Sequence, residues 1–228
     1  MNTLAGMIDH TLLKPETPLG QYTQLCRDAV EYQFASCCVN SFHVPLVANL
    51  LNAHTLSKVK TCSVIAFPFG LSDIHSKSIE IERAIAKGAH ELDVVINISL
   101  VKTHEWKRLK EEMAEIREAS EHHILKIILE VAALTREEII ESSKISLENN
   151  VDFLKTSTGY FSIKLEPAKT AEYVALLKDL TNGTRCSVKA SGGISSLASC
   201  RLMIDAGASR IGTSKAVEIM SELRGETL

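Results

Sequence analysis

A regular alternation of short apolar runs with longer amphipathic stretches is the feature that most constrains the fold. The stretches between the runs place apolar residues on one helical face, as in Leu109, Met113 and Ile116, with charged residues on the other. The runs are rich in β-branched residues, which favours strands. Eight strands are predicted, near Met7–Thr11, Ala35–Asn40, Val59–Phe67, Glu91–Asn97, Ile124–Glu130, Phe153–Ser157, Ser187–Ala190 and Arg210–Gly212.

Eight strand–helix units in 228 residues leave about 28 residues per unit, close to the minimum of roughly 30 for a strand–helix–strand step. The chain therefore has room for one domain, residues 1–228. Parallel strands that are covered on both faces read as continuous apolar runs, so an α/β fold of the single (β/α)8 TIM barrel type is predicted. A doubly wound open sheet is the alternative. No glycine-rich dinucleotide fingerprint follows an early strand, which disfavours that sheet and a nucleotide cofactor.

Charge and composition exclude several classes of function. The 25 Lys and Arg against 28 Asp and Glu give a net charge of -3, which leaves no cationic excess for nucleic acid. The longest apolar stretch, 124–134, is interrupted by Lys126 and Glu130, so no membrane span is expected. The first residues lack the features of a signal peptide, which predicts a cytoplasmic protein. Without a C-x-x-C or H-E-x-x-H pattern, no metal site is expected.

Polar residues interrupt five of the predicted strands. They are Asp9 and Thr11, Asp93, Lys126 and Glu130, Lys155, and Lys189. Strand alternation directs both Lys155 and Lys189 away from the helix layer and into the barrel. Burying an unpaired ammonium group is costly. The two lysines therefore either form a structural network with Asp93, Asp9 or Glu130, or they are kept for amine chemistry.

Amine chemistry requires a neutral lysine. A free lysine has a pKa near 10.4, so only about one in 2,500 is neutral at pH 7. Desolvation and a neighbouring ammonium group both favour the neutral amine. The pair Lys155 and Lys189 on neighbouring strands meets this requirement, and a carboxylate such as Asp93 could transfer protons in a Schiff-base reaction.

Small-residue loops follow the last three strands. These are Thr156–Gly159, Ser191–Gly193 and Gly212–Ser214, with a helix expected to begin near Ser195. Backbone N–H groups in such loops and at a helix N-terminus can surround a phosphate. One Gly-Gly pair would also suit a tight turn, but three successive loops predict a phosphate site.

At these residues the chain resembles the deoxyribose-phosphate aldolase family, whose members are class I Schiff-base aldolases with a (β/α)8 barrel. The resemblance runs nearly end to end and includes both lysine motifs and the aspartate motif in family order. The matching segments are Ile8-Asp-His-Thr-Leu-Leu-Lys-Pro15, Cys38-Val-Asn40, Phe67-Pro68, Glu91-Leu-Asp-Val-Val-Ile-Asn97, Asp152-Phe-Leu-Lys-Thr-Ser-Thr-Gly159, Val188-Lys-Ala-Ser-Gly-Gly193 and Arg210-Ile-Gly-Thr-Ser214.

The resemblance implies reversible cleavage of 2-deoxy-D-ribose 5-phosphate to acetaldehyde and D-glyceraldehyde 3-phosphate in deoxyribose phosphate catabolism, with no cofactor and no metal. It implies that Lys155 forms the Schiff base, that Lys189 favours the neutral amine of Lys155, and that Asp93 transfers protons. Asp9 would hold Lys189. The remaining substrate contacts that it implies are Thr11 and Cys38 at the acetaldehyde end, and Thr158, Gly159, Gly192, Gly193, Thr213 and Ser214 in the phosphate loops. For Cys38 the alternative is an apolar residue that fills space beside Cys37.

Two departures from the family pattern lie beside the expected phosphate site. Tyr160 stands where relatives carry Phe or Lys, and the 162–170 loop differs in sequence. Two other functions remain open: a Schiff-base aldolase or transaldolase for another sugar phosphate, and a non-catalytic barrel that binds phosphosugars. The expected partners are a sugar phosphate and an aldehyde, with no nucleic acid and no membrane. Assembly into a homo-oligomer is left open by the sequence.

Overall fold

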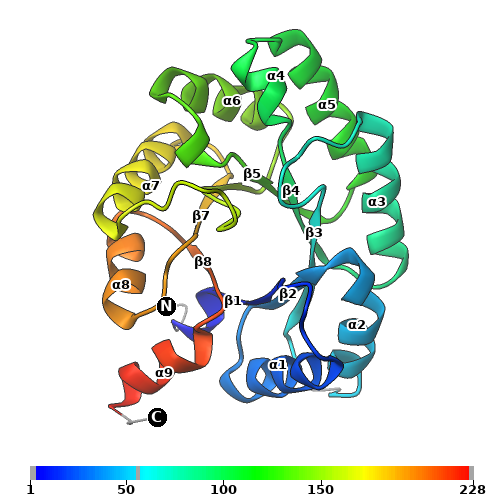
Figure 1. The fold of residues 1–228 in the computed structure, drawn as a ribbon, viewed down its shortest axis with the longest axis vertical. Helices are drawn as coiled ribbons and strands as arrows, with labels where there is room; N and C mark the ends of the chain where they lie inside the picture. Colours follow the sequence, from blue (N-terminus) through cyan, green and yellow to red (C-terminus); the bar gives the residue numbers. More distant parts are fainter. Residues whose placement is uncertain (1–3, 55–56, 226–228) are drawn as a thin grey trace.

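The computed structural model describes residues 4–54 and 57–225, which form a closed barrel of parallel strands (Figure 1). Residues 1–3, on which part of the signal-peptide argument rests, lie outside this range. The strands follow the order β1-β2-β3-β4-β5-β6-β7-β8, and β1 closes the barrel by pairing with β8. The strands are β1 (Ile8–Leu12), β2 (Ser36–Asn40), β3 (Lys60–Ile65), β4 (Glu91–Val95), β5 (Ile124–Ile128), β6 (Phe153–Lys155), β7 (Ser187–Ser191) and β8 (Arg210–Thr213).

Helices surround the strands as an outer ring (Figure 1). They are α1 (Leu19–Tyr32), α2 (Val44–Asn52), α3 (Ile74–Ala86), α4 (Ile98–Lys102), α5 (Trp106–Ala119), α6 (Arg136–Glu148), α7 (Pro167–Thr181), α8 (Leu197–Asp205) and α9 (Ala216–Arg224). The described residues also form three short 3-10 helices: η1 (Ala5–Met7) precedes β1, and η2 (Ser41–His43) and η3 (Val131–Ala133) lie in the connections after β2 and β5. In the part of the chain that is described, no helix has the length and apolar character needed to cross a membrane.

The boundaries of the helices follow local chemistry. Thr135 caps α6 by accepting a hydrogen bond from the backbone N–H of Glu138, whose side chain in turn accepts from the Thr135 backbone N–H. After α8 the chain turns at Gly207 with φ of 109°, a conformation that L side chains rarely adopt. These boundaries place one helix between each pair of successive strands except β4 and β5, which are joined by both α4 and α5.

The barrel confirms the predicted fold and shows that the open-sheet alternative is wrong, since β1 and β8 are paired. Four strands were predicted two residues too long at their carboxyl ends, namely β3, β4, β5 and β6. After β3 and β5 the backbone enters the left-handed region, at Ala66 with φ of 51° and near Glu130 with φ of 57°. Glu130 therefore belongs to the loop after β5 rather than to the strand, because left-handed backbone cannot continue a ladder.

The core has two parts of different character. Apolar side chains such as Leu92, Val94 and Leu154 alternate along the strands and pack in the large core cluster that the helices cover. The alternating residues Glu91, Asp93 and Lys155 on these strands are also buried, but they are charged. A second, small apolar cluster of Leu13, Cys38, Cys62 and Val64 lies apart from the large one, and Cys62 contacts Asp93. Strand periodicity therefore separates the apolar layer outside the barrel from an interior that holds these charges.

Candidate active site

Charged side chains from five strands meet inside the barrel: Asp9 on β1, Asp93 on β4, Lys126 on β5, Lys155 on β6 and Lys189 on β7. Each of these residues is at most 3% exposed. The register brings them to similar heights, because Lys126 lies opposite Asp93 on the adjacent strand and Lys155 lies opposite Lys189. The prediction that both lysines of the expected pair point into the barrel is confirmed.

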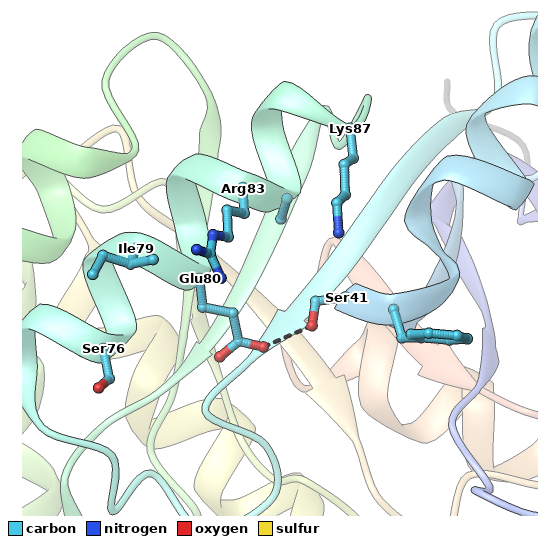
Figure 2. Close-up of a pocket in the computed structure, with 8 residues that line it drawn as sticks. Ser41, Ser76, Ile79, Glu80, Arg83 and Lys87 are labelled. Atoms are coloured by element: carbon cyan, nitrogen blue, oxygen red, sulfur yellow. Dashed lines mark hydrogen bonds between the residues drawn. The ribbon is translucent and has the colours of Figure 1, made fainter.

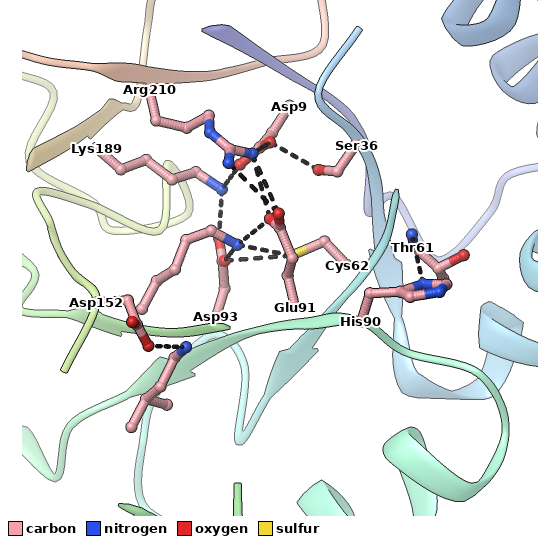
Figure 3. Close-up of polar contacts among 12 residues, drawn as sticks. Asp9, Ser36, Thr61, Cys62, His90, Glu91, Asp93, Asp152, Lys189 and Arg210 are labelled. Carbon is pink, nitrogen blue, oxygen red and sulfur yellow. Dashed lines mark hydrogen bonds and ion pairs between the residues drawn. The ribbon is translucent and has the colours of Figure 1, made fainter. Parts of the chain in front are cut away.

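The Asp93 carboxylate contacts all three lysines of this group, and Figure 3 shows its contact with Lys189. Its Oδ2 accepts hydrogen bonds from Lys155 Nζ at 2.7 Å and from Lys189 Nζ at 2.6 Å. Its Oδ1 accepts from Lys126 Nζ at 2.9 Å. One carboxylate therefore holds three ammonium groups from neighbouring strands, two of them on the same oxygen atom.

The two buried aspartates are stabilised as anions. Burial by itself would raise the pKa of Asp93, but the charges of Lys126, Lys155 and Lys189 outweigh it and hold the pKa well below its usual range. Burial likewise opposes ionisation of Asp9, whose pKa is nevertheless lowered by Lys189 and Arg210. Both carboxylates are therefore charged at neutral pH.

Two of the three lysines are stabilised as cations. Burial would lower the pKa of Lys189, but the carboxylates of Asp9 at 2.5 Å and Asp93 raise it above the ordinary value. For Lys126 the same balance between burial and the charge of Asp93 raises the pKa, and Glu91 contributes a second carboxylate at 2.7 Å. Both side chains therefore remain protonated and are unsuited to act as nucleophiles.

Lys155 differs from these two lysines in its contacts and in its position. Its ammonium group contacts one carboxylate, that of Asp93, on an oxygen that it shares with Lys189. Lys155 also lines the pocket above the charged cluster, whereas Lys126 and Lys189 lie beneath it. Lys155 is thus the lysine of this cluster that a small molecule in the pocket can reach.

The pocket opens at the carboxyl ends of β1, β6, β7 and β8 and has a volume of about 680 Å3. Gly192 has φ of 92°, and a side chain there would come within 3.2 Å of Ser157 Cβ, so glycine keeps the two loops close together. Helix α8 is capped by Ser196 and begins at Leu197, two residues after the predicted position near Ser195. The predicted residues that line the pocket are Thr11, Lys155, Thr158, Gly159, Gly192, Gly193, Thr213 and Ser214.

Three further lysines line the pocket, and none was assigned from the sequence. They are Lys14 after β1, Lys164 after β6 and Lys215 after β8, and the acidic residue among the lining residues is Glu16. Lys164 Nζ donates a hydrogen bond to the carbonyl of Gly159 at 2.8 Å. Lys215 pairs with Glu218 at 2.6 Å, but Lys14 and Lys164 still outnumber Glu16 in the lining. The pocket therefore has a positive excess although the chain as a whole carries a charge of -3, as expected for an anion site.

The other predicted residues lie below or beside the pocket. Glu130 lies beside the pocket and fixes the lining residue Thr158, because its carboxylate accepts hydrogen bonds from the backbone N–H and the hydroxyl of Thr158. Asp9 contacts Lys189, as the resemblance implied. Cys38 is fully buried next to Cys62, beneath the lining residues rather than among them.

One group of side chains among the described residues has the spacing of metal ligands. The ligand atoms of Cys38, Cys62 and Asp93 lie within 4.8 Å of one another. The oxygens of Asp93 already accept from three ammonium groups, so a cation at this position would face like charges. We assign no metal to this group.

A second hollow, of about 410 Å3, lies outside the barrel between η2 and α3 (Figure 2). Glu80 joins its two sides, because one carboxylate oxygen accepts from Ser41 Oγ at 2.8 Å and the other accepts from the backbone N–H of Ala66 at 2.9 Å. None of the predicted site residues lines it. The barrel pocket is therefore the candidate active site.

The chain is similar to known proteins over nearly its full length. A family model described as DeoC/LacD family aldolase matches residues 3–214. A protein of Caldanaerobacter subterraneus subsp. tengcongensis named deoxyribose-phosphate aldolase is 41% identical over 99% of this chain and 95% of its own length. A Staphylococcus aureus protein named deoxyribose-phosphate aldolase 2 is 40% identical over 98% of each chain.

Solved structures give the same similarity. A protein titled QR15, an aldolase, matches with a TM-score of 0.89 at 36% identity, over 99% of this chain and 97% of the other. The deoxyribose phosphate aldolase of Aeropyrum pernix, described as a tetramer, matches with a TM-score of 0.86 at 32% identity, over 97% of this chain and 91% of the other.

Proposed function

Because this chain belongs to the DeoC/LacD family of aldolases, it is a carbon–carbon lyase, and we propose 2-deoxy-D-ribose 5-phosphate as its substrate. The products are acetaldehyde and D-glyceraldehyde 3-phosphate, and the reaction is reversible. The observation that carries this proposal is the placement of Lys155. It is the pocket-lining lysine of a buried cluster, and loops that suit a phosphate surround the same pocket.

The chemistry starts at the neutral amine of Lys155, which attacks the aldehyde carbon of the open-chain sugar. The carbinolamine that forms loses water to give an iminium ion. This ion accepts the electron pair of the C2–C3 bond when the proton of the 3-hydroxyl is removed, which releases glyceraldehyde 3-phosphate. Protonation of the remaining enamine and hydrolysis then release acetaldehyde and restore Lys155. The iminium nitrogen accepts the electrons, so the proposed steps need no metal or organic cofactor.

Asp93 is the proposed proton carrier, through a water molecule. Its Oδ2 lies 2.7 Å from Lys155 Nζ, within reach of the carbinolamine formed there. Lys189 contacts the same oxygen, and its positive charge disfavours a second positive charge on the neighbouring Lys155. Asp9 keeps Lys189 in this position from the opposite side.

The phosphate is proposed to lie against the loops that contain Gly159, Gly192, Gly193, Thr213 and Ser214. Backbone N–H groups of such loops can donate to phosphate oxygens. The lysines at the pocket rim add positive charge. Thr11 and Thr158 line the same pocket, nearer to the sugar in this arrangement, while Cys38 is proposed to shape the acetaldehyde end from below.

The direct test is an assay of the purified protein with 2-deoxy-D-ribose 5-phosphate, with acetaldehyde and glyceraldehyde 3-phosphate measured separately. Equal amounts of the two products are expected. Cleavage of another sugar phosphate, with none of this substrate, would instead identify an aldolase of different specificity. Binding of sugar phosphates without any turnover would identify a non-catalytic barrel.

Replacing Lys189 with leucine is expected to move the acidic limb of the kcat/KM profile to higher pH, by about one to three units. The substitution removes a cation that shares an oxygen with Lys155, so the ammonium form of Lys155 is repelled less. The measurement is kcat/KM between pH 5 and 9, with circular dichroism as the control for folding. An unchanged profile would exclude Lys189 from the mechanism.

Replacing Tyr160 with lysine is expected to lower KM for the phosphorylated substrate about two- to fivefold, the effect of one exposed ion pair. Tyr160 lines the pocket next to Gly159 and contacts Phe67 edge-on. Tyr160→Met removes the ring without adding charge and serves as the matched control. Unphosphorylated 2-deoxyribose should show no change in KM, and an equal change for both sugars would contradict a phosphate effect.

We propose the cytoplasm as the location, because a phosphorylated sugar carries charges that do not cross a lipid bilayer readily. Assembly with identical subunits is also proposed, by analogy with the tetramer described for the Aeropyrum pernix protein. Light scattering of the purified protein tests the second proposal.

A further inference from the structure

Beneath Asp93 the charged cluster continues into a closed ring (Figure 3). Arg210, at the start of β8, contacts Asp9 at 2.6 Å and Glu91 at 3.2 Å. Glu91 contacts Lys126 at 2.7 Å, and Lys126 contacts Asp93 at 2.9 Å. The ring closes through Lys189, which joins Asp93 to Asp9.

Charges alternate around this ring. Lys126, Lys189 and Arg210 each contact two carboxylates of the ring, and each of Asp9, Glu91 and Asp93 contacts two cations of the ring. The formal charges of the six side chains therefore sum to zero. Lys155 is not part of the ring. Its ammonium group contacts one ring member, Asp93.

The protonated form of Lys155 thus gives the buried cluster one surplus positive charge. A surplus charge is costly away from water, and loss of one proton removes it. Lys155 is the cation of the cluster with the fewest anionic partners, and it is the one that lines the pocket. The charge of the ring, including its distant members, is therefore coupled to the protonation of the nucleophile.

Charged and titratable groups face Lys155 from most sides of the barrel and from the pocket. They are Asp9 on β1, Cys38 on β2, Cys62 on β3, Glu91 and Asp93 on β4, Lys126 on β5, Lys189 on β7 and Arg210 on β8, with Lys14, Glu16, Tyr160, Lys164 and Lys215 at the pocket and Glu130 beside Thr158. Arg210 is the ring member farthest along the contacts from Lys155, and Glu91 and Asp9 come next at an equal number of contacts. Neither Arg210 nor Glu91 lines the pocket.

We propose that Arg210 and Glu91 are positioning residues which, by keeping the ring neutral, set the pH at which Lys155 becomes a neutral amine. This inference rests on the proposed Schiff-base function. The two residues touch no substrate and act through Asp9, Lys126 and Lys189. Burial strengthens the coupling because water screens these charges little.

The test changes the charge of the ring and follows the acidic limb of the pH profile. Arg210→Met removes one positive charge, so the cluster is neutral when Lys155 is protonated. The acidic limb is therefore expected to move to higher pH by about one unit. Glu91→Gln removes one negative charge and so adds a surplus positive charge to the cluster. The acidic limb is expected to move to lower pH by a similar amount. The double variant Arg210→Met/Glu91→Gln restores the original sum, and its limb is expected to return close to that of the wild type.

A purely structural role gives a different pattern. In that case both single variants lose activity at all pH values with an unmoved limb, and the double variant is the least active. That pattern would overturn the proposal. Arg210→Lys keeps the charge and is expected to keep the limb in place, so it separates charge from shape. If Arg210→Met does not fold, two other variants test the dependence of the acidic limb on the charge of the ring. Glu91→Gln is expected to move the limb to lower pH, and Lys189→Leu is expected to move it to higher pH.

The readout should not depend on the natural substrate. The rate at which Lys155 captures acetaldehyde, trapped with cyanoborohydride and followed by mass spectrometry from pH 5 to 9, reports the same limb. If this protein cleaves a different sugar phosphate, the shifts in trapping rate are still expected. If Lys155 captures no acetaldehyde at any pH in the wild-type protein, the Schiff-base function itself is wrong.

Discussion

Replacing Lys155 with leucine is expected to lower kcat by on the order of 10^5-fold or more, because the substitution removes the nucleophile. Leucine keeps much of the side-chain volume at the end of β6, and Asp93 keeps Lys126 and Lys189 as partners. The barrel is therefore expected to fold. The measurement is kcat with 2-deoxy-D-ribose 5-phosphate, with near-UV circular dichroism as the check on the fold.

The matched control for this variant is Lys144→Leu, which changes an exposed lysine on α6 that pairs with Glu141. Activity close to that of the wild type is expected for this control. Turnover by the Lys155 variant within tenfold of the wild type would show that another group forms the covalent intermediate.

Replacing Asp93 with asparagine is expected to have two large effects. The amide cannot carry a proton between reacting groups, which lowers kcat by about 10^2- to 10^4-fold. It also leaves three buried ammonium groups without their shared anion. Breaking a buried ion pair from one side costs about 3–5 kcal/mol in the free energy of unfolding. Urea denaturation at pH 7 measures the second effect.

The stability effect should depend on pH in a defined direction. In the folded protein the pKa of Asp93 is well below its usual range. Burial would raise this pKa, but the charges of Lys126, Lys155 and Lys189 lower it by more. The stabilisation is therefore complete above the unfolded pKa near 3.9 and is lost as pH falls below it. The difference between wild type and Asp93→Asn should be largest at neutral pH and smaller at pH 3. A difference that grows in acid would contradict the assignment of Asp93 as a buried anion.

Local patterns in the sequence were sufficient to predict the barrel. The apolar residues of each strand are sufficient to predict that strand, and the capping box of α6 lies within four consecutive residues. The alternation along β6 and β7 also predicted the direction of Lys155 and Lys189, because it depends on the strand alone. The ends of β3, β4 and β5 were missed because the apolar residues Ala66, Ile96 and Leu129 follow these strands. The end of β6 was missed although the next residues, Thr156 and Ser157, are polar.

The contacts between strands could not be predicted in the same way. Glu91 is part of a motif and Lys126 stands out as a charge in an apolar run, but their pairing depends on register and barrel tilt. Arg210 begins its strand and carries no local sign that it reaches Asp9. The rim lysines, Lys14 and Lys164 among them, lie in loops whose paths no periodicity describes. The neutral ring therefore emerges only from the closed fold.

The central claim is that Lys155 forms a Schiff base, and reductive trapping tests it most directly. The folded protein is incubated with acetaldehyde and borohydride, digested, and mapped by mass spectrometry. A two-carbon adduct on Lys155, absent from Lys155→Leu and unchanged in Lys144→Leu, is the predicted result. No adduct on the folded wild-type protein, or an adduct on Lys189 or Lys164 that persists in the Lys155 variant, would contradict the account.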